Sequence, residues 1–99
     1  MKRTLSILGS TGSIGRQTLD VAQACGHQVA ALTVNRSVEL AEQQARQFQP
    51  QLVVAVDESA AQDLKQRLAD TSIRVVGGRE GLMEAATLPQ ADTVVTAVV

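Results

Sequence analysis

Residues 4–26 read TLSILGSTGSIGRQTLDVAQACG, and this stretch decides how the chain begins to fold. Its first five residues are mostly apolar, as in a buried strand, and its last part has the periodicity of an amphipathic helix. Between them lies a loop, residues 9–15, with glycines three residues apart at Gly9, Gly12 and Gly15. Such glycines allow, in turn, a tight bend, a close approach of backbone to a pyrophosphate, and close packing of helix on strand.

The same loop is a candidate binding site for an anion. The first amides of a helix have no partner inside the helix, and the helix dipole adds about 0.3 to 1 kcal/mol of attraction at an exposed site. A tight turn alone would account for the glycines, but the order of strand, loop and amphipathic helix favours a phosphate-bearing dinucleotide. The predicted contacts are Gly9, Thr11, Gly12, Ser13, Ile14 and Gly15.

A second candidate segment, Asn35-Arg36-Ser37, stands about twenty residues after the loop, at the end of the second predicted strand. NAD-specific sites place a carboxylate here against the ribose hydroxyls. This chain instead offers an amide, a guanidinium and a hydroxyl, which suit the 2′-phosphate of NADPH. One charge-assisted hydrogen bond contributes about 1.5 to 3 kcal/mol, so Arg36 alone would favour NADPH by about tenfold to a hundredfold. The alternative is a solvated arginine followed by a helix cap at Ser37.

Along the rest of the chain, apolar runs of strand length alternate with longer segments of helical periodicity. Strands are predicted at residues 4–8, 28–34, 52–56, 73–76 and 93–99. Helices are predicted at about residues 13–25, 38–49, 57–69 and 79–87. This order predicts an α/β fold, a Rossmann-like, doubly wound and mainly parallel sheet with flanking helices. Most of the strands are nearly continuous in apolar residues, which predicts burial on both faces.

Helix ends and faces can also be predicted. Gly26 suits a left-handed cap, Ser37 an N-cap, and Pro50 stops the second helix, while either Asp57 or Ser59 opens the third. The buried face of the first helix is predicted to hold Ile14, Thr18, Ala22 and Cys25. The buried face of the second is predicted to hold Val38, Ala41, Ala45 and Phe48.

Composition excludes several classes of function. The 99 residues are 44% hydrophobic, with Phe48 as the single aromatic residue and a formal net charge of −1. Nucleic-acid binders carry a basic surplus or aromatic stacking platforms, so nucleic acid is not an expected partner. No apolar run approaches the roughly 18 residues of a membrane span, and the opening residues show no targeting signal.

The other reactive side chains suggest no chemistry. Cys25 is the only cysteine, which excludes an internal disulfide and favours a reducing, cytoplasmic compartment. We expect Cys25 to pack in the core and His27 to lie in a turn. Helix-start or solvated charges are expected at Asp57, Glu58, Asp63 and Asp70. We therefore assign no catalytic residue and no metal ligand.

The end of the chain bears on domain organisation. Residues 93–99 read as a strand of the sheet core, and a protein seldom stops at such a strand. We expect residues 1–99 to form one NADP-binding domain, a truncated part of a longer enzyme.

The glycine loop followed by Thr-Leu-Asp-Val at residues 18–21 closely resembles the opening of 1-deoxy-D-xylulose 5-phosphate reductoisomerases. Residues 29–32 and 35–37 are similar to the family's second strand and basic NADPH loop, where Gly-Lys-Asn is frequent and Arg36 keeps the positive charge. Residues 91–99 resemble the strand that leads to the nicotinamide-side loop.

This resemblance implies an enzyme that rearranges 1-deoxy-D-xylulose 5-phosphate and reduces the product with NADPH to 2-C-methyl-D-erythritol 4-phosphate, in isoprenoid precursor synthesis. It implies a divalent Mg or Mn ion and a homodimer for the complete enzyme. The family's metal and substrate residues lie beyond Val99, so the chain alone is expected to bind NADPH without turnover.

Two other interpretations stay open at this point. One is the nucleotide domain of another NADP-dependent dehydrogenase, similar to aspartate-semialdehyde dehydrogenase. The other is a nucleotide-sensing or subunit-interaction module without chemistry. Fold alone does not separate them.

Overall fold

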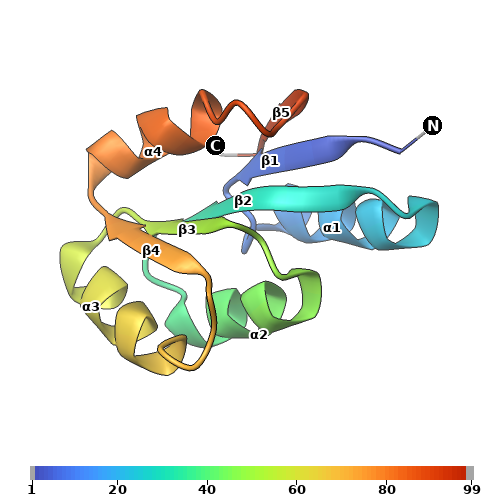
Figure 1. Ribbon diagram of the computed structural model, residues 1–99. Helices are drawn as coiled ribbons and strands as arrows, with labels where there is room; N and C mark the ends of the chain where they lie inside the picture. Colours follow the sequence, from blue (N-terminus) through green and yellow to red (C-terminus); the bar gives the residue numbers. More distant parts are fainter. Residues whose placement is uncertain (1, 98–99) are drawn as a thin grey trace.

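The computed structural model describes residues 2–97, in which five strands and four helices alternate (Figure 1). The strands are β1 Thr4–Leu8, β2 Gln28–Val34, β3 Leu52–Ala55, β4 Arg74–Gly77 and β5 Thr93–Thr96. The helices are α1 Ser13–Cys25, α2 Val38–Phe48, α3 Glu58–Arg67 and α4 Arg79–Ala86. The predicted order is confirmed, and most element ends lie within one or two residues of their predicted positions.

All five strands pair in parallel, in the order β4-β3-β2-β1-β5. The chain builds outward from β1 to β4 and then returns to pair β5 with the free side of β1. In open α/β sheets, ligands bind outside the carboxyl ends of the strands at such a reversal. The predicted Rossmann-like sheet is therefore confirmed, and its reversal point lies beside β1.

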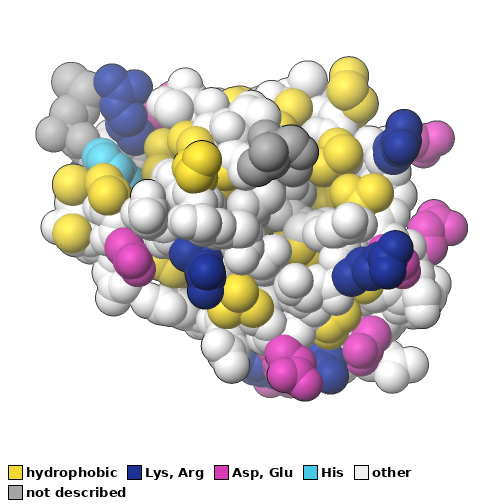
Figure 2. Space-filling view, turned by 180° about the vertical axis from the view of Figure 1, so that it is seen from behind, with side chains coloured by type: hydrophobic (Ala, Val, Ile, Leu, Met, Phe, Trp, Pro, Cys, Tyr) yellow, Lys and Arg dark blue, Asp and Glu magenta, His cyan; other side chains and the backbone are white. Residues whose placement is uncertain are grey.

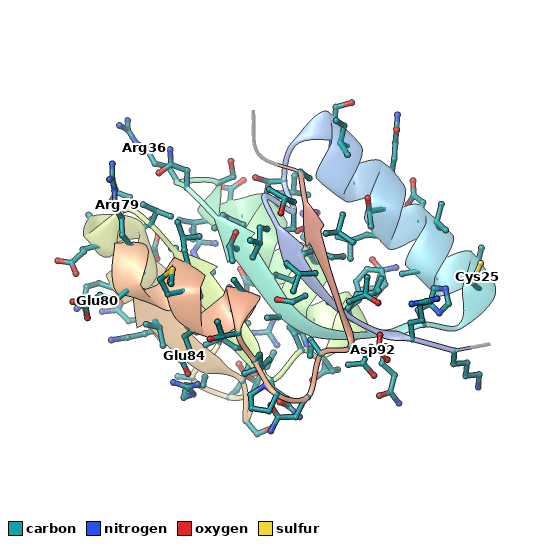
Figure 3. The ribbon with its side chains drawn as sticks, turned by 90° about the horizontal axis from the view of Figure 1, so that it is seen from above. Cys25, Arg36, Arg79, Glu80, Glu84 and Asp92 are labelled. Atoms are coloured by element: carbon teal, nitrogen blue, oxygen red, sulfur yellow. The ribbon has the colours of Figure 1, made fainter. Side chains whose placement is uncertain are left out.

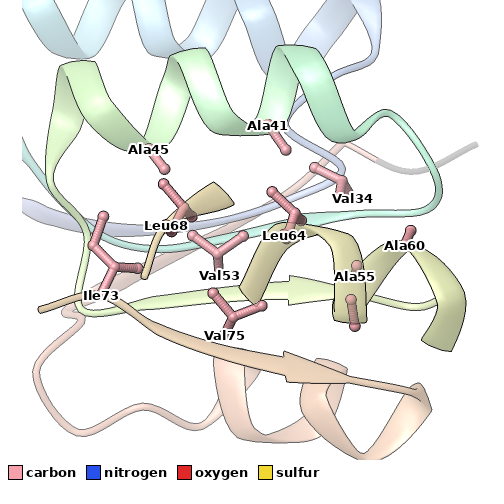
Figure 4. Close-up of a cluster of buried hydrophobic side chains, with 11 residues drawn as sticks. Val34, Ala41, Ala45, Val53, Ala55, Ala60, Leu64, Leu68, Ile73 and Val75 are labelled. Atoms are coloured by element: carbon pink, nitrogen blue, oxygen red, sulfur yellow. The ribbon is translucent and has the colours of Figure 1, made fainter. Parts of the chain in front are cut away.

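Helices cover both faces of this sheet. The first three helices lie on one face and α4 lies on the other (Figure 1). Neighbouring β3 residues show the alternation, because Val53 joins the core under α2 and α3 (Figure 4), whereas Val54 joins the core with Ala85 of α4. Strands β2 and β3 are consequently buried on both faces, as their continuous apolarity predicts.

The last strand differs from its prediction. We expected residues 93–99 to form a strand of the sheet core, but β5 is an edge strand in the described chain, and Val94 is 42% exposed. Its burial alternates because only one of its faces packs against the α1 side, through Val95. Residues 98 and 99 of the predicted strand lie outside the described residues.

The predicted face of α1 is partly wrong. The buried residues are Gly15, Leu19 and Ala22, whereas Ile14 is 55% exposed and Cys25 is also exposed. The cause is Gly15, because a Cβ there would lie 2.1 Å from the Gly9 carbonyl oxygen. The helix can approach the sheet only with Gly15 turned inward, and this rotation leaves Ile14 outside.

The face of the molecule turned away from the view of Figure 1 carries hydrophobic side chains scattered among polar ones (Figure 2).

The predicted helix ends can be compared in the same way. Gly26 has the expected left-handed conformation, with φ of 74°. Of the two alternatives for α3, Asp57 is the N-cap, and its carboxylate accepts a hydrogen bond of 3.0 Å from the Ala60 amide. Ser37 occupies the N-cap position of α2, but its side chain makes no capping hydrogen bond.

An ion network joins the outer sides of α2 and α3. Arg46 pairs with Glu42 and Asp70, and Arg67 pairs with Glu42 and Asp63. Asp63 and Asp70 are thus paired rather than simply solvated. The hydrogen bond from Arg67, and then that from Arg46, lowers the pKa of Glu42. A carboxylate with a lowered pKa favours the fold above its unfolded-state pKa, and that contribution disappears as the pH falls through the folded-state pKa.

The rotation of α1 predicts a contrast between two substitutions. Leu19→Ala removes a side chain that is only 3% exposed and should cost about 2 to 5 kcal/mol of unfolding free energy. Ile14→Ala truncates an exposed side chain and should change it by less than about 0.5 kcal/mol. Urea denaturation of the chain measures both, and equal losses would contradict this placement of α1.

Candidate functional site

A cleft of about 560 Å³ opens at the carboxyl ends of the strands. Its walls come from four strand ends and from the start of α4. The lining residues are Leu8, Gly9, Thr11, Gly12, Thr33, Val34, Asn35, Val56, Arg79, Leu82 and Ala97. The cleft therefore brings the glycine loop and the end of β2 together at the reversal point of the sheet, as the sequence predicts.

Backbone hydrogen bonds fasten the glycine loop to β2. The Gly9 amide donates to the Thr33 carbonyl oxygen at 3.1 Å and to its hydroxyl oxygen at 2.9 Å. The Ser10 amide donates to the same carbonyl at 2.9 Å. Gly9 has φ of 90°, a conformation that a residue with a side chain rarely adopts. The tight bend predicted at Gly9 is thus present.

A buried polar pair holds the loop from the other side. The Ser10 hydroxyl donates to Gln44 Oε1 at 2.8 Å, and Gln44 Nε2 donates to the Ser10 carbonyl at 2.9 Å. Ser10 is fully buried and Gln44 is only 6% exposed. Sequence analysis identified neither residue, because a glutamine and a serine read as surface residues. The one signal is that Gln44 falls between Ala41 and Ala45 on the buried face of α2.

The three loop glycines have different reasons to be glycine. Gly15 needs the absence of a Cβ for contact with the Gly9 carbonyl. Gly12 has no such internal reason, since a Cβ there would meet only the Gly9 oxygen at 3.8 Å, an ordinary contact, and its φ is −78°. Gly12 caps α1 without any side-chain hydrogen bond, so the first amides of that helix are open to a ligand. Ser13 and Ile14 stand in this exposed first turn.

The segment of residues 35–37, predicted to bind the ribose 2′-phosphate, lies at the rim of the cleft. Asn35 lines the cleft, whereas Arg36 and Ser37 line a neighbouring open hollow. The Arg36 side chain is 80% exposed, and its Nε lies 3.6 Å from Asp57 Oδ2. Because Ser37 makes no side-chain cap, its hydroxyl is free of that role. Asp57 thus performs two tasks, capping α3 and holding Arg36.

Arg79 is a cleft residue that sequence analysis missed. It follows β4, and the carboxyl ends of parallel strands meet at one edge of a sheet, which is the signal that was available. Arg36 and Arg79 lie at one end of the molecule and Cys25 at the opposite end (Figure 3). His27 lies in the turn before β2, as predicted, and its Nδ1 accepts a hydrogen bond from the Arg3 amide.

No group of three or more His, Cys, Asp or Glu side chains among residues 2–97 is placed to hold a metal ion. None of the helices in this part of the chain combines the length and the apolar character that crossing a membrane requires.

Strand order, glycine loop and cleft together define a class of protein, the Rossmann-like α/β domains that open a ligand site at the reversal point of the sheet. Comparison with known proteins then identifies the family. The family model for 1-deoxy-D-xylulose 5-phosphate reductoisomerase matches residues 5–99. The chain belongs to this family.

The chain is similar to reductoisomerases from several organisms. The reductoisomerases of Agathobacter rectalis and Desulfitobacterium hafniense are each 52% identical to it, over 98% and 99% of the chain. A solved structure of the Zymomonas mobilis reductoisomerase in complex with NADPH is 38% identical over 95% of the chain, with a TM-score of 0.88. A further reductoisomerase, solved with NADPH, fosmidomycin and magnesium, is 32% identical over 97%, with a TM-score of 0.90. The chain spans about a quarter of these proteins, 26% of each curated relative and 24% to 25% of each structure.

The buried Ser10–Gln44 pair yields a stability prediction. Gln44→Leu keeps a similar size but leaves two buried polar groups of Ser10 without partners, so the unfolding free energy should fall by about 1 to 3 kcal/mol. Gln43→Leu, at the exposed neighbouring position, is the control and should change it by less than about 0.5 kcal/mol. Denaturant unfolding measures both variants, and an unchanged midpoint for Gln44→Leu would contradict the proposed importance of the pair.

Proposed function

We propose that this chain is the NADPH-binding part of a 1-deoxy-D-xylulose 5-phosphate reductoisomerase. One observation carries the proposal. The uncapped start of α1 faces the cleft beside a β2 end that presents Arg36 rather than a carboxylate. Amides attract a diphosphate and a guanidinium attracts a 2′-phosphate, so this pairing suits the phosphorylated coenzyme.

The chain's own residues would bind and orient the coenzyme in two groups. The diphosphate would lie against the loop and the first turn of α1, at Gly9, Thr11, Gly12, Ser13, Ile14 and Gly15. Gly12, which has no internal need to be glycine, would let the diphosphate approach the backbone. The adenosine ribose and its 2′-phosphate would lie against Asn35, Arg36 and Ser37. Two similar reductoisomerases were solved in complex with NADPH, which supports NADPH as the ligand.

When bound, NADPH supplies the hydride for reduction. In the complete enzyme the reaction would rearrange 1-deoxy-D-xylulose 5-phosphate and reduce it to 2-C-methyl-D-erythritol 4-phosphate, a step of isoprenoid precursor synthesis. Residues 2–97 would hold the coenzyme in place, and they offer no residue for proton transfer in the cleft. Among residues 2–97 no group of three or more His, Cys, Asp or Glu side chains could hold a magnesium or manganese ion, so metal chemistry is assigned none of these residues.

The family match favours this proposal over another NADP-dependent dehydrogenase. A nucleotide-sensing module makes a different prediction. A protein that joins this chain to the remaining three quarters of the family's length would then bind NADPH but show no turnover. The proposal includes a homodimeric complete enzyme and a cytoplasmic location, the latter supported by the single cysteine.

The central test is coenzyme selectivity. NADPH should bind the chain about tenfold to a hundredfold more tightly than NADH, and Arg36→Glu should narrow or reverse this ratio because it places a negative charge beside the 2′-phosphate. Isothermal titration calorimetry measures the affinities. Lys65→Glu, the same charge reversal on α3 outside the cleft, should leave the ratio unchanged. Equal affinity for both coenzymes, unaltered in Arg36→Glu, would remove the proposal.

A further inference from the structure

The cleft is lined by a cation, Arg79, that the proposed site does not use. Arg79 is the first residue of α4 and lines the cleft together with Asn35 and the glycine loop. It reaches the cleft from α4, the helix on the sheet face opposite α1 and α2 (Figure 1). Its guanidinium and that of Arg36 extend at the same end of the molecule (Figure 3). The two cations therefore stand at one rim but on different elements.

The backbone that carries Arg79 is held tightly by glycines. A Cβ on Gly81 would lie 2.6 Å from Val54 Cγ1, and one on Gly77 would lie 2.8 Å from the Ala61 Cβ. Gly78 has φ of 87°, which turns the chain from β4 into α4. The end of β4 is thus packed against α3 and the first turn of α4 against β3, so the backbone position of Arg79 is fixed while the residue itself is exposed.

The two arginines differ in whether a carboxylate offsets their charge. Arg36 lies 3.6 Å from Asp57, which offsets its charge, whereas Arg79 forms no ion pair with any carboxylate of residues 2–97. Glu80 follows Arg79 in the chain and Glu58 lies near Gly78, yet neither pairs with it. A phosphate monoester carries about −1.5 to −2 charges at pH 7. The Arg36–Asp57 pair alone does not neutralise such a group.

We propose that Arg79 is a specificity-determining residue that binds the adenosine 2′-phosphate of NADPH from the side opposite Arg36. The inference rests on the proposed function and deepens it. Asp57 offsets much of the positive charge of Arg36, and the Arg79 guanidinium supplies the charge that the 2′-phosphate still needs. Stacking of Arg79 on adenine and contact with the diphosphate are different roles, and the experiment separates them.

Two probes isolate the group in question. Adenosine 2′,5′-bisphosphate and adenosine 5′-monophosphate differ only in the 2′-phosphate, and neither needs the nicotinamide side of the cleft. Calorimetry on the chain should show Arg79→Ala binding the bisphosphate about tenfold or more weakly, with monophosphate affinity unchanged. Arg79→Lys should retain part of the bisphosphate affinity because it keeps the charge but loses the planar donor pair. Equal weakening of both probes, or of neither, would overturn the inference.

Matched controls separate this inference from the proposed function. Arg3→Ala also removes an arginine side chain, but at the amino end of β1, where Arg3 donates to the Thr93 hydroxyl. It should change neither affinity. Arg36→Glu is measured in the same assay. If the unsubstituted chain does not prefer the bisphosphate, the proposed function fails. If it does prefer it and loses that preference in Arg36→Glu but keeps it in Arg79→Ala, only the role of Arg79 is wrong. A thermal melt of each variant confirms that it is folded.

Discussion

The contact between Gly15 and the Gly9 carbonyl is the constraint on which the rest of this structure depends. The absence of one Cβ, which would stand 2.1 Å from that oxygen, lets α1 begin directly against the carboxyl end of β1. The same contact sets the rotation of α1, burying Leu19 and leaving Ile14 exposed. It also aims the uncapped first turn of the helix at the reversal point of the sheet, where an anion has room.

A loop of glycines would be loose without polar anchors, because glycine loses more conformational freedom on folding than any other residue. Here the anchors come from both neighbours in space. Thr33 at the end of β2 accepts from the Gly9 and Ser10 amides, and Gln44 of α2 closes two hydrogen bonds with Ser10. Unpaired, such buried groups would be costly, yet no buried side-chain polar atom of the described residues lacks a partner. The loop is thereby shaped before any ligand arrives, which reduces the entropy that binding must overcome.

What the sequence could predict depended on whether the signal was local. Strand and helix order follows from the alternation of apolar periods, and the positions of Gly9 and Gly26 follow from turn and cap chemistry, so these were predictable. Cap chemistry narrowed the start of α3 to Asp57 or Ser59, and the structure selects Asp57. The face of α1 was not, because its decisive residue is a glycine, which has no apolar side chain to count. Gln44 and Arg79 were missed for a different reason. Gln44 matters through its contact with Ser10, 34 positions away, and Arg79 through a cleft that it shares with the glycine loop and the end of β2. Only the sheet order brings those partners together.

Asp57 shows how the fold avoids an NAD-type site while keeping an acidic residue close to the rim. In such a site a carboxylate must be free to accept from the ribose hydroxyls. The Asp57 carboxylate is already engaged, with one oxygen on the Ala60 amide and the other toward Arg36. A ligand phosphate would draw Arg36 into a bond stronger than a 3.6 Å surface pair, which typically contributes no more than about 1 kcal/mol. The helix cap would be unaffected by that exchange, because it uses the other oxygen. Coenzyme choice can therefore be decided at the rim without disturbing the start of α3.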